Sequence, residues 1–399
     1  MKRFLLLSAF IIQIVSVSGQ DSYHAILKAD ALCLQNQATA AVQELTDQLG
    51  REKSTALYCS RGEAYLKAGL LKQAVSDFNS AESLTPGTGL YGLARAAALS
   101  GNAKAAVSYL RALMKTSYKP DEPSIDKDSV FEKISSSGDW KSFWQGDWYR
   151  EYERIKWEIE YYVRNGKADL AREEYADLSA KYPDTWITDY CGALIDIESG
   201  SAGTAVKKLT SCLAREDRPE AHLALAKAYS SEGEYYSAAL EYGKLISTGY
   251  NDASLFVKRA EMLRKAGDRS AATEDLDYYL SLYPEDGTAL SLMGKCLAES
   301  GDLYKALPYM NRNIELHPGD ASAFSDRGDV YFTSRSWANA ISDYSMSLDL
   351  NPSNGTVYLN LGISLINSGN KSDACSFLRK ALALGEKNAA KYISSNCGQ

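Results

Sequence analysis

The residues that could do chemistry in this chain are few and lie far apart. Only three histidines occur, His24, His222 and His317, and their spacing assembles neither a zinc site nor a histidine-based catalytic triad. The sequence has no phosphate loop, no dinucleotide-binding glycine pattern, no paired-cysteine metal motif and no Gly-x-Ser-x-Gly turn. Aspartate and glutamate are abundant, but no carboxylate pair stands out by its spacing. We therefore predict that the chain is not an enzyme, with no catalytic residue, no metal site and no cofactor.

The seven cysteines leave two alternatives open. Cys191 and Cys212 fall on neighbouring predicted helices, and Cys375 and Cys397 lie near the C-terminal end, so each pair could form a disulfide. The cysteines could equally be small buried apolar residues, and an odd count leaves at least one unpaired or intermolecular.

A charged column is a candidate binding surface. Lys227, Glu261, Lys295 and Asp329 follow one another at steps of 34 residues and alternate in sign. One interpretation is a ladder of intramolecular ion pairs, each worth less than ~1 kcal/mol when exposed. The other is a charged track that recognises a bound peptide. The ladder is favoured, because each charge has a complementary neighbour.

An aromatic segment is the second candidate. Trp140, Trp144 and Trp148 follow a stretch rich in proline and serine. They could form an exposed platform for a sugar or a peptide, since clustered surface aromatics mark binding sites. They could also be a hydrophobic plug between two parts of the chain. The plug is favoured, because tryptophans at helical spacing are more often packed than displayed.

The elements that position these residues repeat with a fixed period. Five columns keep the same 34-residue step, among them an alanine column, an apolar column four residues later, and columns of glycine and proline. Within each period, apolar residues at three-to-four spacing predict two amphipathic helices. Proline after the second helix stops it, since it has no N–H and disfavours helix in the preceding residue. Each period is therefore predicted to be a helix hairpin that must stack on its neighbours to bury its apolar face.

Two segments carry a family resemblance. "ALYCSRGEAYLKAGLLKQAVSDFNSAESLTP" and "SAFSDRGDVYFTSRSWANAISDYSMSLDLNP" place an aromatic residue, Gly, Tyr, Ala, an aromatic residue and Pro at the spacing of the tetratricopeptide repeat, which the chain resembles over nearly all its length. The resemblance implies an all-α fold: an α-solenoid, a right-handed superhelix of stacked helix-turn-helix repeats. It also implies a concave groove, lined by the first helix of each repeat, that binds a peptide or protein segment. A Lys/Asn/Arg carboxylate clamp, found in certain relatives, is not supported by the residues in the equivalent columns.

The expected organisation has five parts. Residues 1–19 resemble a signal peptide, with Lys2 and Arg3 before an apolar run too short to span a membrane. The others are an N-terminal array of a degenerate repeat and two further repeats (20–118), a tryptophan-rich junction (119–151), a C-terminal array of about seven repeats (152–388) and a cap (389–399).

The functional prediction follows from these parts. The formal charge of -7 comes from interspersed charges without a basic face, so a nucleic-acid partner is not expected. We expect a periplasmic or secreted scaffold, without a transmembrane segment in the mature chain, that binds another protein or peptide. The alternative is a cell-envelope module that binds glycan or peptidoglycan through the tryptophan-rich junction.

Overall fold

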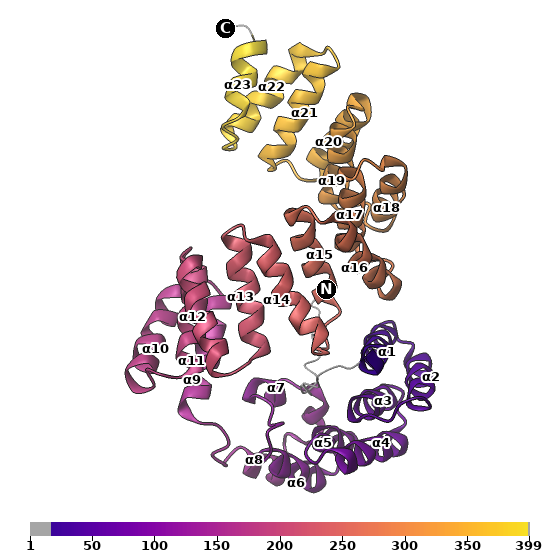
Figure 1. The fold of residues 1–399 in the computed structure, drawn as a ribbon, viewed down its shortest axis with the longest axis vertical. Coiled ribbons are helices and arrows are strands. Elements are labelled where there is room, and N and C mark those ends of the chain that lie inside the picture. The colour runs from indigo at the N-terminus through magenta and orange to yellow at the C-terminus, as the bar shows by residue number, and fades with distance from the viewer. Residues whose placement is uncertain (1–16, 398–399) are drawn as a thin grey trace. The chain divides into compact units, whose positions relative to one another are not determined.

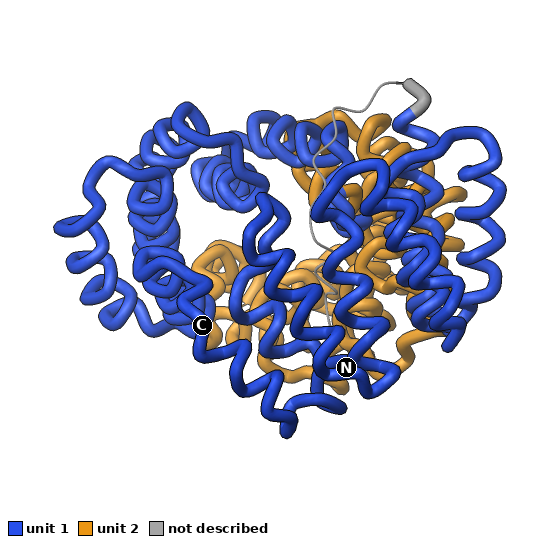
Figure 2. Tube along the Cα trace, turned by 90° about the horizontal axis from the view of Figure 1, so that it is seen from below, with its two compact units in different colours: residues 1–255 blue, residues 256–399 orange. Residues whose placement is uncertain are grey.

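The structure, a computed structural model, describes residues 17–397, and this part of the chain contains helices and no strand (Figure 1). It divides into two compact units, residues 1–255 and 256–399 (Figure 2). Most of the predicted signal peptide, residues 1–16, lies outside the described residues, and residues 17–19 begin the first helix. The predicted boundaries at 118 and 151 concern the sequence period and remain a prediction.

Unit 1 consists of helix pairs interrupted by short helices. The pairs are α1 (Val17–Leu34) with α2 (Ala38–Leu49), α3 (Thr55–Lys67) with α4 (Leu71–Leu84), α5 (Leu90–Leu99) with α6 (Ala103–Leu113), α9 (Glu151–Arg164) with α10 (Ala168–Lys181), α11 (Trp186–Glu198) with α12 (Ala202–Arg215), and α13 (Pro219–Ser231) with α14 (Tyr235–Ser247). The interruption contains α7 (Glu122–Asp126), the 3-10 helix η1 (Ser129–Ile134) and α8 (Gly138–Phe143).

Unit 2 continues the pattern and ends in a cap. Its pairs are α15 (Ser254–Ala266) with α16 (Arg269–Leu282), α17 (Gly287–Glu299) with α18 (Leu303–Leu316), α19 (Ala321–Thr333) with α20 (Trp337–Leu350), and α21 (Gly355–Asn367) with α22 (Lys371–Ala383); α23 (Ala389–Asn396) follows. First helices begin at 287, 321 and 355, one period apart. The prediction of an all-α solenoid of 34-residue helix pairs is confirmed.

The residues of the glycine column contact those of the apolar column. Gly328 leaves room on α19 for the ring of Tyr344 on α20: a methyl group at Gly328 would lie 2.8 Å from the ring. Gly294 has the same relation to Met310. Tyr344 and Met310 are completely buried. Each pair therefore packs a large side chain of the second helix against a bare backbone on the first.

Some pairs are also joined by a buried ion pair. Arg327 on α19 donates two hydrogen bonds, of 2.8 and 2.7 Å, to the carboxylate of Asp343 on α20. Arg61 and Asp77 make the same contact in unit 1. In the degenerate first pair, Lys28 and Glu44 are separated by the same 16 residues and lie 2.6 Å apart. This pair is more exposed than the Arg–Asp pairs, and the prediction of a degenerate first repeat remains a prediction.

The turns inside the pairs need a left-handed backbone. Gly301 follows the last turn of α17 and has a φ of +87°. A side chain would clash with the backbone in this conformation, and glycine avoids the clash because it has none. In the next repeat Arg335 adopts the same conformation, with φ of +59°. The glycine column therefore records a backbone requirement, which Arg335 and, in the first pair, Asn36 (φ of +62°) meet at an energetic cost.

First helices form the inner side of each stack. In unit 2, α19 contacts both α17 and α21, whereas the second helices of neighbouring pairs make at most marginal contact. The stack is thus tighter on the first-helix side, which we call the inner face. In unit 1, two hydrogen bonds join α1 to the loop after α14: Tyr23 Oη to Tyr250 O (2.9 Å) and Asn251 Nδ2 to Asp30 Oδ2 (2.6 Å).

Candidate binding surfaces

The predicted charged column lies on first helices in both units. Lys227 is an exposed residue of α13 in unit 1, and Glu261, Lys295 and Asp329 lie on α15, α17 and α19 of unit 2. In unit 2 the ion pairs do not run along the column. Glu261 pairs with Lys265 one helical turn later (2.8 Å). Lys295 pairs diagonally with Asp326 of α19 (2.6 Å).

Asp329 is held by neutral donors. The buried hydroxyl of Tyr344 donates to Asp329 Oδ1 (2.7 Å), and Nδ2 of Asn360 on α21 donates to the same oxygen (3.2 Å). The surrounding protein removes water from the carboxylate, which disfavours its charged form. This desolvation, together with the nearby negative charge of Asp326, raises the pKa of Asp329. The structure thus brings Asp326, Tyr344 and Asn360 to the predicted column residue.

These three partners were missed in the sequence for different reasons. Asp326 and Asn360 are themselves 34 residues apart, but the same position one period earlier holds Leu292, so the sequence contains only a short polar signal there. Tyr344 belongs to the apolar column, and nothing in its sequence context distinguishes a hydroxyl that reaches the inner face from a buried ring.

The inner face of unit 1 is engaged in internal contacts. Arg95 on α5 is 9% exposed and lies between Glu63 of α3 and Asp128, which immediately precedes η1. Its Nε is 2.9 Å from the Asp128 carboxylate. The hydroxyl of Tyr91 also donates to Asp128 (3.0 Å), and burial beside this carboxylate raises the pKa of Tyr91. The segment that interrupts the period therefore contributes a carboxylate to this face.

The tryptophans of the junction pack to different degrees. Trp140 is buried, stacked on Phe131 with ring centroids 5.1 Å apart, and belongs to an apolar cluster with residues of α5 and α6. Trp144 and Trp148 are half-buried. The indole N–H of Trp148 donates to the carbonyl oxygen of Phe143 (2.6 Å). Trp140 therefore presents almost no surface to a ligand.

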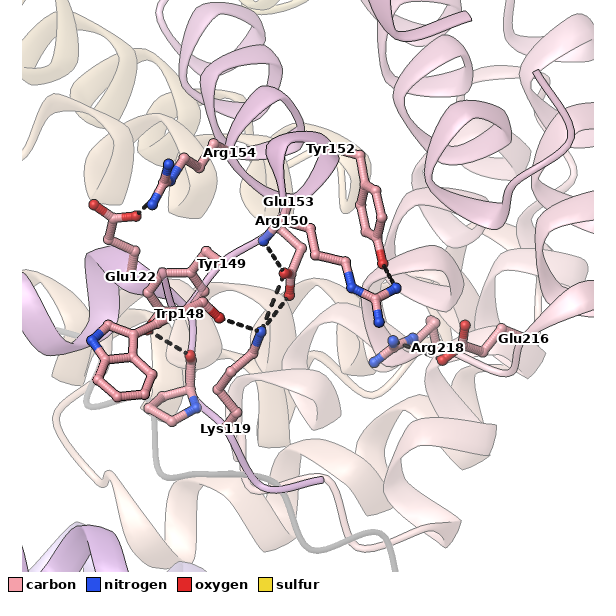
Figure 3. Close-up of polar contacts among 11 residues, drawn as sticks. Lys119, Glu122, Trp148, Tyr149, Arg150, Tyr152, Glu153, Arg154, Glu216 and Arg218 are labelled. Carbon is pink, nitrogen blue, oxygen red and sulfur yellow. Dashed lines mark hydrogen bonds and ion pairs between the residues drawn. The ribbon is translucent and has the colours of Figure 1, made fainter. Parts of the chain in front are cut away.

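A lysine fastens the junction to the start of α9 (Figure 3). Lys119 Nζ donates to the carbonyl oxygen of Trp148 (3.2 Å) and to the carboxylate of Glu153 (2.9 Å). It also lies 4.8 Å from the ring centre of Tyr149. Glu153 in turn accepts the backbone N–H of Arg150, which caps α9. These contacts give the junction a fixed path between α6 and α9.

One of the two possible disulfides is present. Cys375 on α22 is bonded to Cys397, which follows α23. Cys191 and Cys212 are buried and unbonded, and burial raises the pKa of the Cys212 thiol to about 12. The C-terminal pair is therefore a disulfide, whereas the other two cysteines behave as buried apolar residues.

Among residues 17–397, no group of three or more His, Cys, Asp or Glu side chains is arranged to hold a metal ion. Within the same range, no helix combines the length and apolar character needed to cross a membrane.

Comparison with known proteins supports the repeat assignment. Residues 257–321 and 325–389 match the family model described as tetratricopeptide repeat. A tetratricopeptide repeat protein from Parabacteroides merdae is similar in structure, with a TM-score of 0.53, 19% identity, and coverage of 61% of this chain and 97% of that one. The APC/C hetero-tetramer Cut9-Hcn1 has a TM-score of 0.50 at 13% identity, covering 96% and 97%. No curated protein matches the sequence significantly. Residues 257–321 and 325–389 thus match tetratricopeptide repeats, and the described chain has the fold of solenoids built from such repeats.

Proposed function

We propose that this chain is an exported tetratricopeptide-repeat scaffold, which binds an extended segment of another protein and catalyses no reaction. Proteins built from these repeats typically mediate protein–protein interaction, and a long stack of helix pairs offers a continuous surface for such a segment. Fold alone does not assign a function, so the binding face must be argued from its side chains.

The observation that carries the proposal is the contrast between the two inner faces. In unit 1, Asp30, Glu63 and Arg95 are engaged with Asn251 and Asp128, which come from other parts of that unit. Within the described part of unit 2, no segment inserted between helix pairs packs on the inner side of α17, α19 and α21. A partner is therefore expected on unit 2.

The second candidate, a glycan-binding module, is less well supported. A sugar platform needs aromatic faces open to solvent, whereas Trp140 is buried and Trp148 is tied to Phe143. Only the half-buried faces of Trp144 and Trp148 could contribute.

Export is supported by the N-terminal sequence and by the disulfide. A basic start followed by a short apolar run is typical of a signal peptide, and disulfides persist mainly in oxidising compartments. Mass spectrometry of the protein from its native cell should find a mature N-terminus near Gln20. An unprocessed chain with Cys375 and Cys397 reduced would contradict export without affecting the binding proposal.

Two experiments test the binding proposal together. Titration with soluble peptidoglycan fragments should leave tryptophan fluorescence unchanged, and a saturable change would favour the glycan-binding module. A photo-crosslinker at Thr333 on α19 should capture a protein in the native cell, and one at Asn339 on α20 should not. Equal capture from both positions, or from neither, would contradict a partner on the inner face of unit 2.

A further inference from the structure

The charges on the inner face of unit 2 are ordered along the stack. On α15 the inner positions hold Lys258, Glu261, Arg264 and Lys265, an excess of positive charge. On α17 they hold Lys295 and Glu299, which balance. On α19 they hold Asp326 and Asp329, and α21 contains no charged residue at all. The face is thus basic at one end, acidic at α19 and uncharged beyond it.

Most of these charges are already compensated within the unit. Arg264 and Arg269 both contact Glu299, Lys265 contacts Glu261, and Lys295 contacts Asp326. Asp329 is different. Among the described residues no cation makes an ion pair with its carboxylate. The charge of Lys295 acts on Asp329 from a distance, but its ammonium group pairs with Asp326.

The carboxylate of Asp329 is nevertheless fixed in one orientation. Tyr344 and Asn360 both donate to Oδ1, and Oδ2 has no protein donor among the described residues. Tyr344 is completely buried and cannot follow a moving partner, so Oδ1 stays turned toward it. The residue itself is exposed on the inner face. One oxygen is therefore held by the protein and the other is available to a ligand.

The neighbouring surface suits a long basic side chain. Ile363, one period after Asp329, is a partly buried apolar residue on the inner side of α21. The methylene stem of lysine or arginine packs on apolar surface while its head group reaches a carboxylate. A charged donor to a carboxylate also makes a shorter and stronger hydrogen bond than the neutral donors present.

We propose that Asp329 anchors a lysine or arginine side chain of an extended peptide bound along α17, α19 and α21. This inference rests on the proposed function and specifies its partner: a segment with a basic residue opposite α19 and uncharged residues toward α21. An acidic or uncharged segment at α19 would leave the carboxylate without a counter-charge.

A displayed library of random 12-residue peptides, selected on the full chain, tests the anchor. The selected peptides should share a lysine or arginine at a fixed position. Their affinity should fall at least tenfold for Asp329→Asn and remain unchanged for Asp349→Asn. The Asp329→Asn change keeps an acceptor for both Tyr344 and Asn360, so the fold is retained. Asp349 lies exposed on α20, and its change alters the net charge equally.

A matched peptide completes the cycle. Replacing the shared basic residue by glutamine should weaken binding to the wild-type chain tenfold and have little effect on Asp329→Asn, because the two changes remove the same contact. Selected peptides that lack a basic residue, or that bind Asp329→Asn as well as wild type, would overturn the anchor while leaving peptide binding intact. Failure to select any peptide that binds unit 2 would instead contradict the proposed function.

Discussion

The ion pair between Arg327 and Asp343 can be tested against a substitution that the chain itself supplies. One repeat earlier, the two positions hold Met293 and Tyr309, and two repeats earlier they hold Arg259 and Asp275. The same two positions therefore hold either an Arg–Asp ion pair or a buried methionine with a half-buried tyrosine. Arg327→Met removes the cation. The double change Arg327→Met with Asp343→Tyr introduces the two residues that the preceding repeat has at these positions.

The expected magnitudes follow from burial. The Asp343 side chain is only 6% exposed and receives both of its strong hydrogen bonds from Arg327. Removing one partner of a buried pair leaves an uncompensated charge and costs about 3–5 kcal/mol, whereas replacing both by packed apolar groups is often close to neutral. We expect Arg327→Met to cost about 3 kcal/mol and the double variant to lie within about 1 kcal/mol of wild type.

Urea unfolding followed by circular dichroism measures the overall effect, and hydrogen exchange of the amides in α19 and α20 locates it. The local measurement is needed because repeat arrays need not unfold in a single step. A single change that costs less than about 1 kcal/mol, or a double variant no more stable than the single one, would refute the argument from burial.

Three further predictions concern packing, protonation and the cap. Gly328→Ala should cost about 1–2 kcal/mol in urea unfolding, because its methyl group would lie 2.8 Å from the Tyr344 ring, while Gly319→Ala, with open space around it, should change little; equal effects would contradict the packing argument. His222 lies 2.5 Å from Glu241 and 2.8 Å from Asp217, and although burial opposes the charge, these two carboxylates raise its pKa. The stability gained from its charged form is present below pH 6.5 and is lost as pH rises through the raised pKa, so His222→Phe should lower the melting temperature at pH 6 and much less at pH 9; a pH-independent difference would contradict this. Reduction of Cys375–Cys397, which closes a loop with a sequence separation of 22, should destabilise the packing of the cap helix α23 on α22 by about 3 kcal/mol, with hydrogen exchange rising first in these two helices. An equal rise when reductant is added to a chain with both cysteines replaced by serine would contradict this prediction.

The period made most of the fold predictable from sequence. A column such as Gly294, Gly328 and Gly362 records a packing requirement met again in each repeat, so its spacing gives the helix pairs and their order. The junction was harder, because α7, η1 and α8 are short and Asp128 reaches Arg95 only after the chain has turned back on α5. No periodic signal marks such a contact.

The candidate site was predictable only in part. The column analysis found Asp329 because inner positions recur every 34 residues. It paired the charges along the column, whereas Lys295 reaches Asp326 diagonally. Which carboxylate Lys295 reaches depends on the rotation of one helix pair relative to the preceding pair. Residue spacing does not encode this rotation. The role of the Tyr344 hydroxyl is equally invisible in a column read as apolar.

Hydrogen exchange of the full chain, with and without a bound partner segment, tests the central claim most directly. If that segment lies on the inner face of unit 2, protection should appear in the first helices α17, α19 and α21 and be weak in the second helices α18, α20 and α22. Protection confined to the second helices or to the junction at residues 119–151 would contradict the claim.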